Sequence, residues 1–106
     1  MTLLYHWAPV ERRPSILRRG LVPGSWSRDR LWRPPYMCFA DSPSLAWGLS
    51  GGTSPTHSEW DLWMVDDDRL GGYEVIPFDG EPDRIKEYRV YERVYKRDLW
   101  WVGTRS

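Results

Sequence analysis

Sixteen of the 106 residues are aromatic, and eight of these sixteen are tryptophans. Leu, Ile, Val and Phe together number only 22, which is close to the fraction below which chains tend to stay disordered. Each large aromatic side chain buries roughly 150–250 Å², so the aromatic residues supply the apolar area that the aliphatic residues lack. We therefore expect a folded chain whose main core material is Trp. At this length we expect one domain, over residues 1–106.

The charged residues are balanced in number but segregated along the chain. Lys plus Arg and Asp plus Glu each number 15, so the net charge is zero and gives no argument for a nucleic-acid or membrane partner. The balance is +5 over residues 1–35, −9 over 36–83 and +4 over 84–106. We expect the fold to bring two basic ends around an acidic middle, or to show two faces of opposite sign.

Cysteine and histidine are too scarce for a disulfide or a metal site. Cys38 is the one cysteine, which excludes an intramolecular disulfide and a Cys-based zinc site. Two histidines, His6 and His57, make no convincing metal site. The sequence has no run of about 18 apolar residues and no signal-peptide pattern. We therefore expect a cytoplasmic protein with no membrane partner and no metal.

Hydrophobic periodicity predicts an α+β chain with two short helices and five to six short strands in small mixed or antiparallel sheets. The helices are expected at 11–19 and 44–49, and the strands at 3–7, 36–40, 60–65, 73–77, 87–94 and 99–102. Gly20 is the expected end of the first helix, and Asp41-Ser42-Pro43 the expected start of the second. Loops are predicted at 24–35 and 50–58.

Three separated features would have to converge to form an active site. They are His6 at the end of the first strand, the strand-turn-helix segment 36–47, and an acidic residue near the start of a late strand. In this order the chain resembles the ADP-ribosyltransferase fold. In that family a His ends the first strand, often as Tyr-His-Gly-Thr, and a helix ending in an Ile-Leu-x-x-Gly-Leu phrase follows. This chain has Tyr5-His6-Trp7-Ala8 and Ile16-Leu17-Arg18-Arg19-Gly20-Leu21.

The resemblance continues through the middle and the end of the chain. A second family strand reads Tyr-Phe-Ala-Asp and is followed by Ser-x-Ser and an aromatic residue. Here the corresponding segments are Cys38-Phe39-Ala40-Asp41 and Ser42-Pro43-Ser44-Leu45-Ala46-Trp47. The family's catalytic Glu begins a late strand, as Glu87-Tyr88-Arg89-Val90 is expected to do.

The resemblance implies that NAD is the substrate and that ADP-ribose is transferred to a protein or nucleic-acid target. The residues implied as catalytic are His6, Tyr36 and Glu87, and those implied as NAD-binding are His6, Trp7, Arg12, Arg13, Tyr36, Ser44 and Trp47. Tyr36 and Trp47 would stack on the nicotinamide ring, His6 would bond a ribose hydroxyl or a phosphate, and the two Arg side chains would meet the pyrophosphate. Glu87 would stabilise the positive charge that develops on the ribose.

Several positions depart from the family pattern and leave alternatives open. Trp7-Ala8 stands where the family has Gly-Thr, and Cys38 stands where it has Tyr, with Tyr36 as a substitute on the same strand face. Glu92 is an alternative to Glu87, because it shares the parity of the apolar positions in the predicted strand. Glu74 and Glu81 remain further alternatives.

Other functions are compatible with the same residues. One is RNA 2′-phosphotransferase, which uses NAD in the same fold. Another is a non-catalytic inhibitor or toxin-type protein that binds a partner through exposed Trp and Arg. Buried Trp residues beside a converging site favour the enzyme, whereas Trp and Arg clustered on a convex face favour the binder. Trp60, Trp63, Trp100 and Trp101 are expected to pack, and Trp26 and Trp32 lie in a loop where packing is not required.

Overall fold

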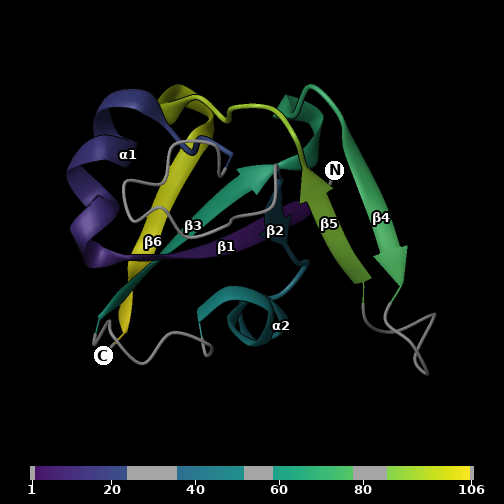
Figure 1. Cartoon of the computed structure of the whole chain (residues 1–106), viewed down its shortest axis with the longest axis horizontal. Coiled ribbons are helices and arrows are strands. Elements are labelled where there is room, and N and C mark those ends of the chain that lie inside the picture. The colour runs from purple at the N-terminus through teal and green to yellow at the C-terminus, as the bar shows by residue number, and fades with distance from the viewer. Residues whose placement is uncertain (1, 24–35, 52–58, 78–85, 106) are drawn as a thin grey trace.

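A computed structural model describes residues 2–23, 36–51, 59–77 and 86–105 (Figure 1). In chain order, its elements are β1 (Leu3–Pro9), η1 (Val10–Arg12), α1 (Arg13–Arg19), β2 (Met37–Phe39), α2 (Pro43–Ala46), η3 (Trp47–Gly51), β3 (Trp60–Asp66), η4 (Asp67–Arg69), β4 (Tyr73–Pro77), β5 (Lys86–Val90), η5 (Lys96–Asp98) and β6 (Leu99–Arg105). The predicted loop at 24–35 with Trp26 and Trp32 lies outside the described residues, as do His57, Glu81 and most of the loop predicted at 50–58.

The strands form two small sheets in the orders β1-β3-β6 and β2-β5-β4, and every pairing among the described strands is antiparallel. One isolated antiparallel bridge joins the two sheets. In it the Tyr5 N–H donates to the Ala40 carbonyl at 2.7 Å, and the Ala40 N–H donates to the Tyr5 carbonyl at 3.1 Å. The predicted α+β class and two short helices are confirmed, with antiparallel rather than mixed sheets in the described part of the chain.

Local sequence explains where both helices start or stop. Gly20 ends α1 at a φ of +79°, a conformation open to Gly because it has no Cβ. The hydroxyl oxygen of Ser42 accepts the Leu45 N–H at 3.2 Å and so caps the N-terminus of α2. The second helix begins at Pro43, one residue before the predicted start. It continues as the π-helical turn η3, which ends at Gly51.

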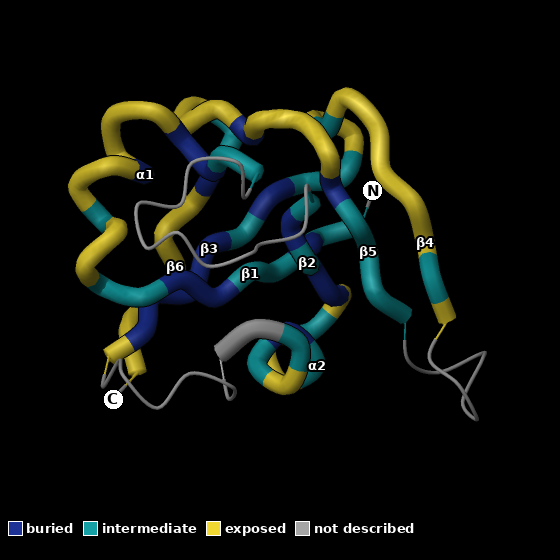
Figure 2. The backbone as a smooth tube through the Cα atoms, in the orientation of Figure 1, coloured by how far each residue is buried: buried dark blue, intermediate teal, exposed yellow. Residues whose placement is uncertain are grey.

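The core lies in two clusters on opposite sides of β1, because successive strand side chains point to opposite faces. One cluster includes Leu4, Phe39 and Trp63, and the other includes Trp7 and Trp60 beneath α2 and η3. The buried stretches run along β1, β2 and β3 in Figure 2. The prediction that Trp60 and Trp63 pack in the core is confirmed.

Two predictions about the last strands are wrong. The strand expected over 87–94 ends at Val90, because the chain then leaves the sheet and Val94 pairs with Leu21 instead. Glu92 is therefore exposed outside β5, and the parity argument that placed it in the interior fails.

The other correction concerns two tryptophans that were expected to pack. Trp100 is 54% exposed and Trp101 is 48% exposed, since β6 is an outer strand of its sheet. Among the described strands β6 has a neighbour on one side alone, so each of these side chains is flanked by another strand on one side only.

The described chain has a Cα radius of gyration of 13.0 Å, about the value of a compact chain of this length. No helix in the described segments is both long and apolar enough to span a membrane.

Candidate active site

Glu87 lies near the start of β5, where two neighbouring side chains hold its carboxylate. The Cys38 thiol on β2 donates to Glu87 Oε1 at 2.9 Å, and Arg89 Nε donates to the same oxygen at 3.1 Å. The Glu87 side chain is only 12% exposed. Charge-assisted bonds of this kind fix a carboxylate firmly. The sheet thus presents one oriented, largely buried carboxylate between two strands.

The chemistry of Cys38 keeps this arrangement stable at neutral pH. Burial, reinforced by the hydrogen bond to Glu87, raises the pKa of the Cys38 thiol to about 12. The thiol therefore stays protonated and acts as a donor rather than as a second negative charge beside Glu87. A thiol with so little thiolate is also a poor nucleophile.

Tyr36 shares the sheet face that carries Glu87. It lies two residues before Cys38, and alternating positions of an extended chain point to the same side. The Arg89 guanidinium lies over the Tyr36 ring, 4.4 Å from its centroid. Tyr91 contacts the Tyr36 ring edge-on at 5.6 Å. Arg89 thus connects the carboxylate of Glu87 with an aromatic ring.

A second aromatic group lies on the same face, across the bridge from β2 to β1. Trp7 and Trp47 meet edge to face at 5.3 Å, and Trp47 meets Trp60 edge to face at 5.6 Å. The indole N–H of Trp7 donates to the Pro43 carbonyl at 2.8 Å, which ties β1 to the start of α2. The Trp7 side chain therefore packs under α2 and holds it in place.

A planar cation already stacks on this aromatic group. The guanidinium of Arg105, at the end of β6, lies 4.0 Å from the Trp47 ring centroid and 5.8 Å from that of Trp7. Cations are attracted to the negative face of an indole. The Trp47 ring is thus placed to accept a flat, positively charged group.

Ser44 lies in the first turn of α2, on the same short segment as Trp47. Its hydroxyl is exposed and lies 3.4 Å from the Ser42 hydroxyl. Ser42 is used as the helix cap, so Ser44 is the hydroxyl of this turn that remains at the surface.

The structure does not bring His6 onto the face that carries Glu87. His6 follows Tyr5 on β1 and so points to the opposite side, where its ring packs against Phe39 at 5.0 Å. Its Nδ1 lies 2.8 Å from the Cys38 carbonyl oxygen, which requires a proton on Nδ1. Burial lowers the pKa of His6 more than this hydrogen bond raises it.

Arg12 and Arg13 occupy different environments. Arg12 is exposed at the end of η1. Arg13 makes a two-pronged ion pair with Asp61, with both bonds at 2.8 Å, and lies over the Trp101 ring at 4.3 Å. The Asp61 side chain is fully buried. Burial alone would raise the Asp61 pKa, but hydrogen bonds from Arg13 and Thr104 outweigh it, and the pKa is lowered overall.

Sequence reasoning missed Arg89, Arg105 and the Arg13–Asp61 pair. Arg89 stands two residues from Glu87 on a strand, so the period of two was a signal that could have found it. Arg105 and Asp61 gave no such signal. Arg105 meets Trp47, and Asp61 meets Arg13, only because β3 pairs with strands that are distant in the sequence.

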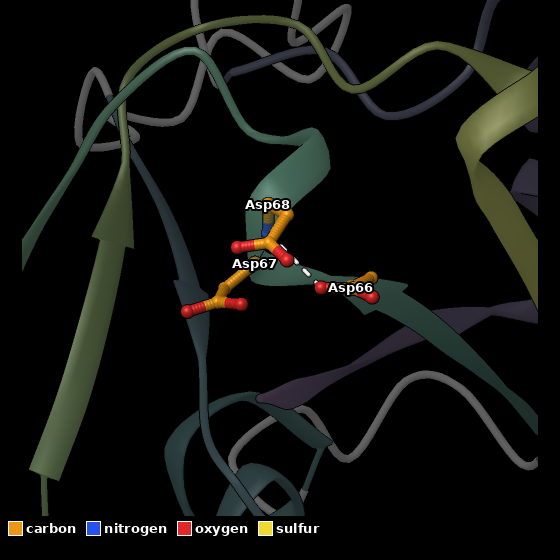
Figure 3. A group of neighbouring side chains, drawn as sticks. All are labelled: Asp66, Asp67 and Asp68. Carbon is orange, nitrogen blue, oxygen red and sulfur yellow. Dashed lines mark hydrogen bonds between the residues drawn. The ribbon is translucent and has the colours of Figure 1, made fainter. Parts of the chain in front are cut away.

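Three consecutive carboxylates, Asp66, Asp67 and Asp68, lie close together at the end of β3 (Figure 3). Hydrogen bonds within the chain occupy two of them. Asp66 accepts the Asp68 N–H at 3.0 Å as the cap of η4, and Asp67 accepts from the Thr2 N–H and the Tyr73 hydroxyl, both at 3.0 Å. We assign no ligand to this group.

Comparisons of the chain with protein-family models, with curated proteins and with solved structures found no match. The contacts around Glu87 and the aromatic group formed by Trp7, Trp47 and Trp60 are therefore the basis for assigning a function.

Proposed function

We propose that this chain is an ADP-ribosyltransferase-like enzyme, which cleaves the nicotinamide–ribose bond of NAD and transfers ADP-ribose to a protein or nucleic-acid target. The observation that carries the proposal is the oriented carboxylate of Glu87, held by Cys38 and Arg89 on a sheet face that also presents aromatic rings. The adjacency of β1, β2 and β5 supports it, since these strands carry the segments that resemble the family.

The aromatic group fits the chemistry of NAD. The nicotinamide ring of NAD is flat and positively charged, and the Arg105 guanidinium that lies on Trp47 is a flat cation as well. Stacking on an indole favours both groups for the same electrostatic reason. In the proposal, nicotinamide takes the place of Arg105, while Ser44 and the main chain of Trp7 bind its amide.

Glu87 supplies the charge that the reaction needs. When the bond between the nicotinamide nitrogen and ribose C1′ breaks, its electron pair leaves with nicotinamide, which becomes neutral. The ribose becomes positively charged, and a nearby carboxylate stabilises that charge. A nucleophile of the target then bonds to C1′ and loses a proton. Tyr36 lines this face, and Arg89 positions the carboxylate.

His6 and the two Arg residues enter the proposal differently. His6 positions β1 against β2 through its bond to the Cys38 carbonyl. Because its ring lies on the face opposite Glu87, the ribose contact expected of it is not part of the proposal. Arg12, which is exposed, is the better placed of the two cations for the pyrophosphate, because Arg13 is bound to Asp61.

The test is nicotinamide release and label transfer from adenylate-labelled NAD, with a cell lysate, RNA and DNA as acceptors. Glu87→Gln keeps the size and an acceptor oxygen for Cys38 but removes the charge. We expect it to lower the rate by about 10²–10³. Glu92→Gln is the matched control, because Glu92 lies outside β5, and we expect it to retain the wild-type rate. Circular dichroism verifies that both variants fold.

Two results would count against the enzyme. One is a wild-type protein that neither releases nicotinamide nor transfers label to any acceptor. The other is a Glu92→Gln variant that loses activity while Glu87→Gln keeps it.

The exposure of Trp100 and Trp101 favours a second candidate, a non-catalytic protein that acts by binding a partner. Trp is enriched among residues that dominate binding energy, and both of these side chains are about half exposed. This candidate predicts that the protein binds its partner and does not cleave NAD. In that case Trp100→Ala, rather than Glu87→Gln, abolishes partner binding.

A further inference from the structure

Two basic segments that are far apart in the sequence meet at one end of the structure. The last turn of α1 and the segment before β6 are joined by the bridge between Leu21 and Val94, whose two hydrogen bonds are both 2.8 Å. Arg93 Nε also donates to the Arg19 carbonyl. Five exposed cations gather there, and we call them the α1–η5 patch: Arg18, Arg19, Arg93, Lys96 and Arg97.

Aromatic contacts hold part of the patch in order. The exposed Tyr95 ring lies against two guanidiniums, with Arg93 at 4.7 Å and Arg97 at 5.0 Å from its centroid. A free Arg side chain loses roughly 1.5–2 kcal/mol of rotamer freedom when it is fixed. Because Tyr95 already restricts both side chains, they lose less rotamer entropy when a ligand binds to them.

The patch carries a large excess of positive charge. Its one ion pair within the described residues joins Arg97 Nε to Asp98 at 3.9 Å, the long limit for such a contact. Glu92, although close in sequence, points elsewhere, because its carboxylate lies beside Gly71 between η4 and β4. Exposed ion pairs of this kind contribute little, so the positive charge of the patch is available to a polyanion.

A hollow of about 290 Å³ adjoins the patch and shares Arg97 with it. Arg69, Arg97, Asp98 and Trp100 line this hollow, and the Trp100 side chain is 54% exposed. An exposed indole provides a surface on which a nucleic-acid base can stack. Asp98 adds an acceptor for the amino group of a base.

We propose that the α1–η5 patch and the adjoining hollow bind single-stranded nucleic acid, with phosphates on the patch and one base on Trp100. Four of the five patch cations are Arg, whose planar fork matches the geometry of phosphate. An acidic protein would also satisfy the charge, and an exposed Trp suits a protein partner as well. Arg forks beside an exposed indole match the alternating phosphates and bases of a single strand more closely. The inference does not depend on NAD cleavage.

The test is the fluorescence anisotropy of a labelled 12-nucleotide single strand of mixed sequence, as DNA and as RNA, titrated with the full chain. If all five patch cations contact phosphate, log K falls against log salt with a slope of about −3.5. We expect Trp100→Ala to weaken binding about tenfold and to reduce the quenching of Trp emission. We expect Arg93→Ala with Arg97→Ala to make the slope less steep by about 1.4.

The chain offers a matched control, because its two lysines differ in place. Lys96 belongs to the patch, whereas Lys86 begins β5 in the other sheet. Lys96→Ala and Lys86→Ala remove the same charge, and only the first should reduce the slope, by about 0.7. Equal effects of the two variants, or no binding of either strand at low salt, would overturn the proposal. Tighter binding of poly-glutamate than of the strand would assign the patch to an acidic protein instead.

Discussion

Replacement of Gly20 by Ala should destabilise the chain more than any other Gly-to-Ala change at a described position. Gly20 has a φ of +79°, and a Cβ there would lie 1.9 Å from the Val94 carbonyl oxygen and 2.9 Å from the Lys96 nitrogen. With a ψ of −164°, this conformation is essentially restricted to Gly, and it costs a non-Gly residue about 1–3 kcal/mol. The clash also breaks the two bridge hydrogen bonds between Leu21 and Val94, each worth about 1 kcal/mol.

Together these effects lower the free energy of unfolding by about 3 kcal/mol or more, out of roughly 5–15 kcal/mol for a domain. Urea denaturation followed by Trp fluorescence and by circular dichroism measures this change. Gly48→Ala is the control, because a Cβ at Gly48 meets nothing within 4 Å; it should stay within about 1 kcal/mol of wild type. A Gly20→Ala variant as stable as Gly48→Ala would refute the reasoning.

Two further predictions concern buried polar groups. Burial lowers the pKa of His6 below its ordinary value of 6.5, so the unfolded chain takes up the proton first as the pH falls. The free energy of unfolding should therefore decline below about pH 6.5, with at most about 1.4 kcal/mol per pH unit coming from this group. Urea titrations at several pH values measure this decline, and His6→Gln should flatten it. An unchanged pH profile in the variant would contradict the lowered pKa of His6. Arg13→Ala should leave the buried Asp61 carboxylate without its cation. In a double-mutant cycle with Asp61→Asn, the two changes in the free energy of unfolding should therefore be strongly non-additive. Simple addition of the two changes would contradict a buried ion pair.

The sequence predicted most of the fold because its signals were local. The turn residues Gly20 and Ser42 marked helix ends that the structure confirms, and the alternating residues from Trp60 onward marked β3. The prediction failed after Val90, where an apolar Val94 continued the strand period but pairs with Leu21 instead. Nothing near Val94 in the sequence indicates a partner that lies more than seventy residues away.

The residues of the candidate site were likewise predicted only in part from the sequence. The sequence singled out Glu87 and Tyr36, which the structure places on one sheet face, and Trp47, which packs against Trp7 from η3. It also singled out His6, which points to the other face. The face of each side chain depends on the strand register, and a shift of one residue reverses it. The partner of Arg13 could not be predicted either, since Asp61 is brought to it by the pairing of β1 with β3.

The aromatic-rich composition by itself predicted a folded core with Trp as its main material. Trp7, Trp60 and Trp63 are buried, but most of the buried apolar residues in the described part of the chain are aliphatic, so the expected dominance of Trp is wrong. Composition could not determine which Trp residues would be buried. Trp63 lies on a central strand and is almost fully buried, whereas Trp100 and Trp101 lie on an outer strand and remain half exposed. Burial depends on what packs over a residue, and that is decided by contacts between distant segments. The meeting of the two basic ends of the chain, which the charge pattern left open, was decided by the bridge between Leu21 and Val94 for the same reason.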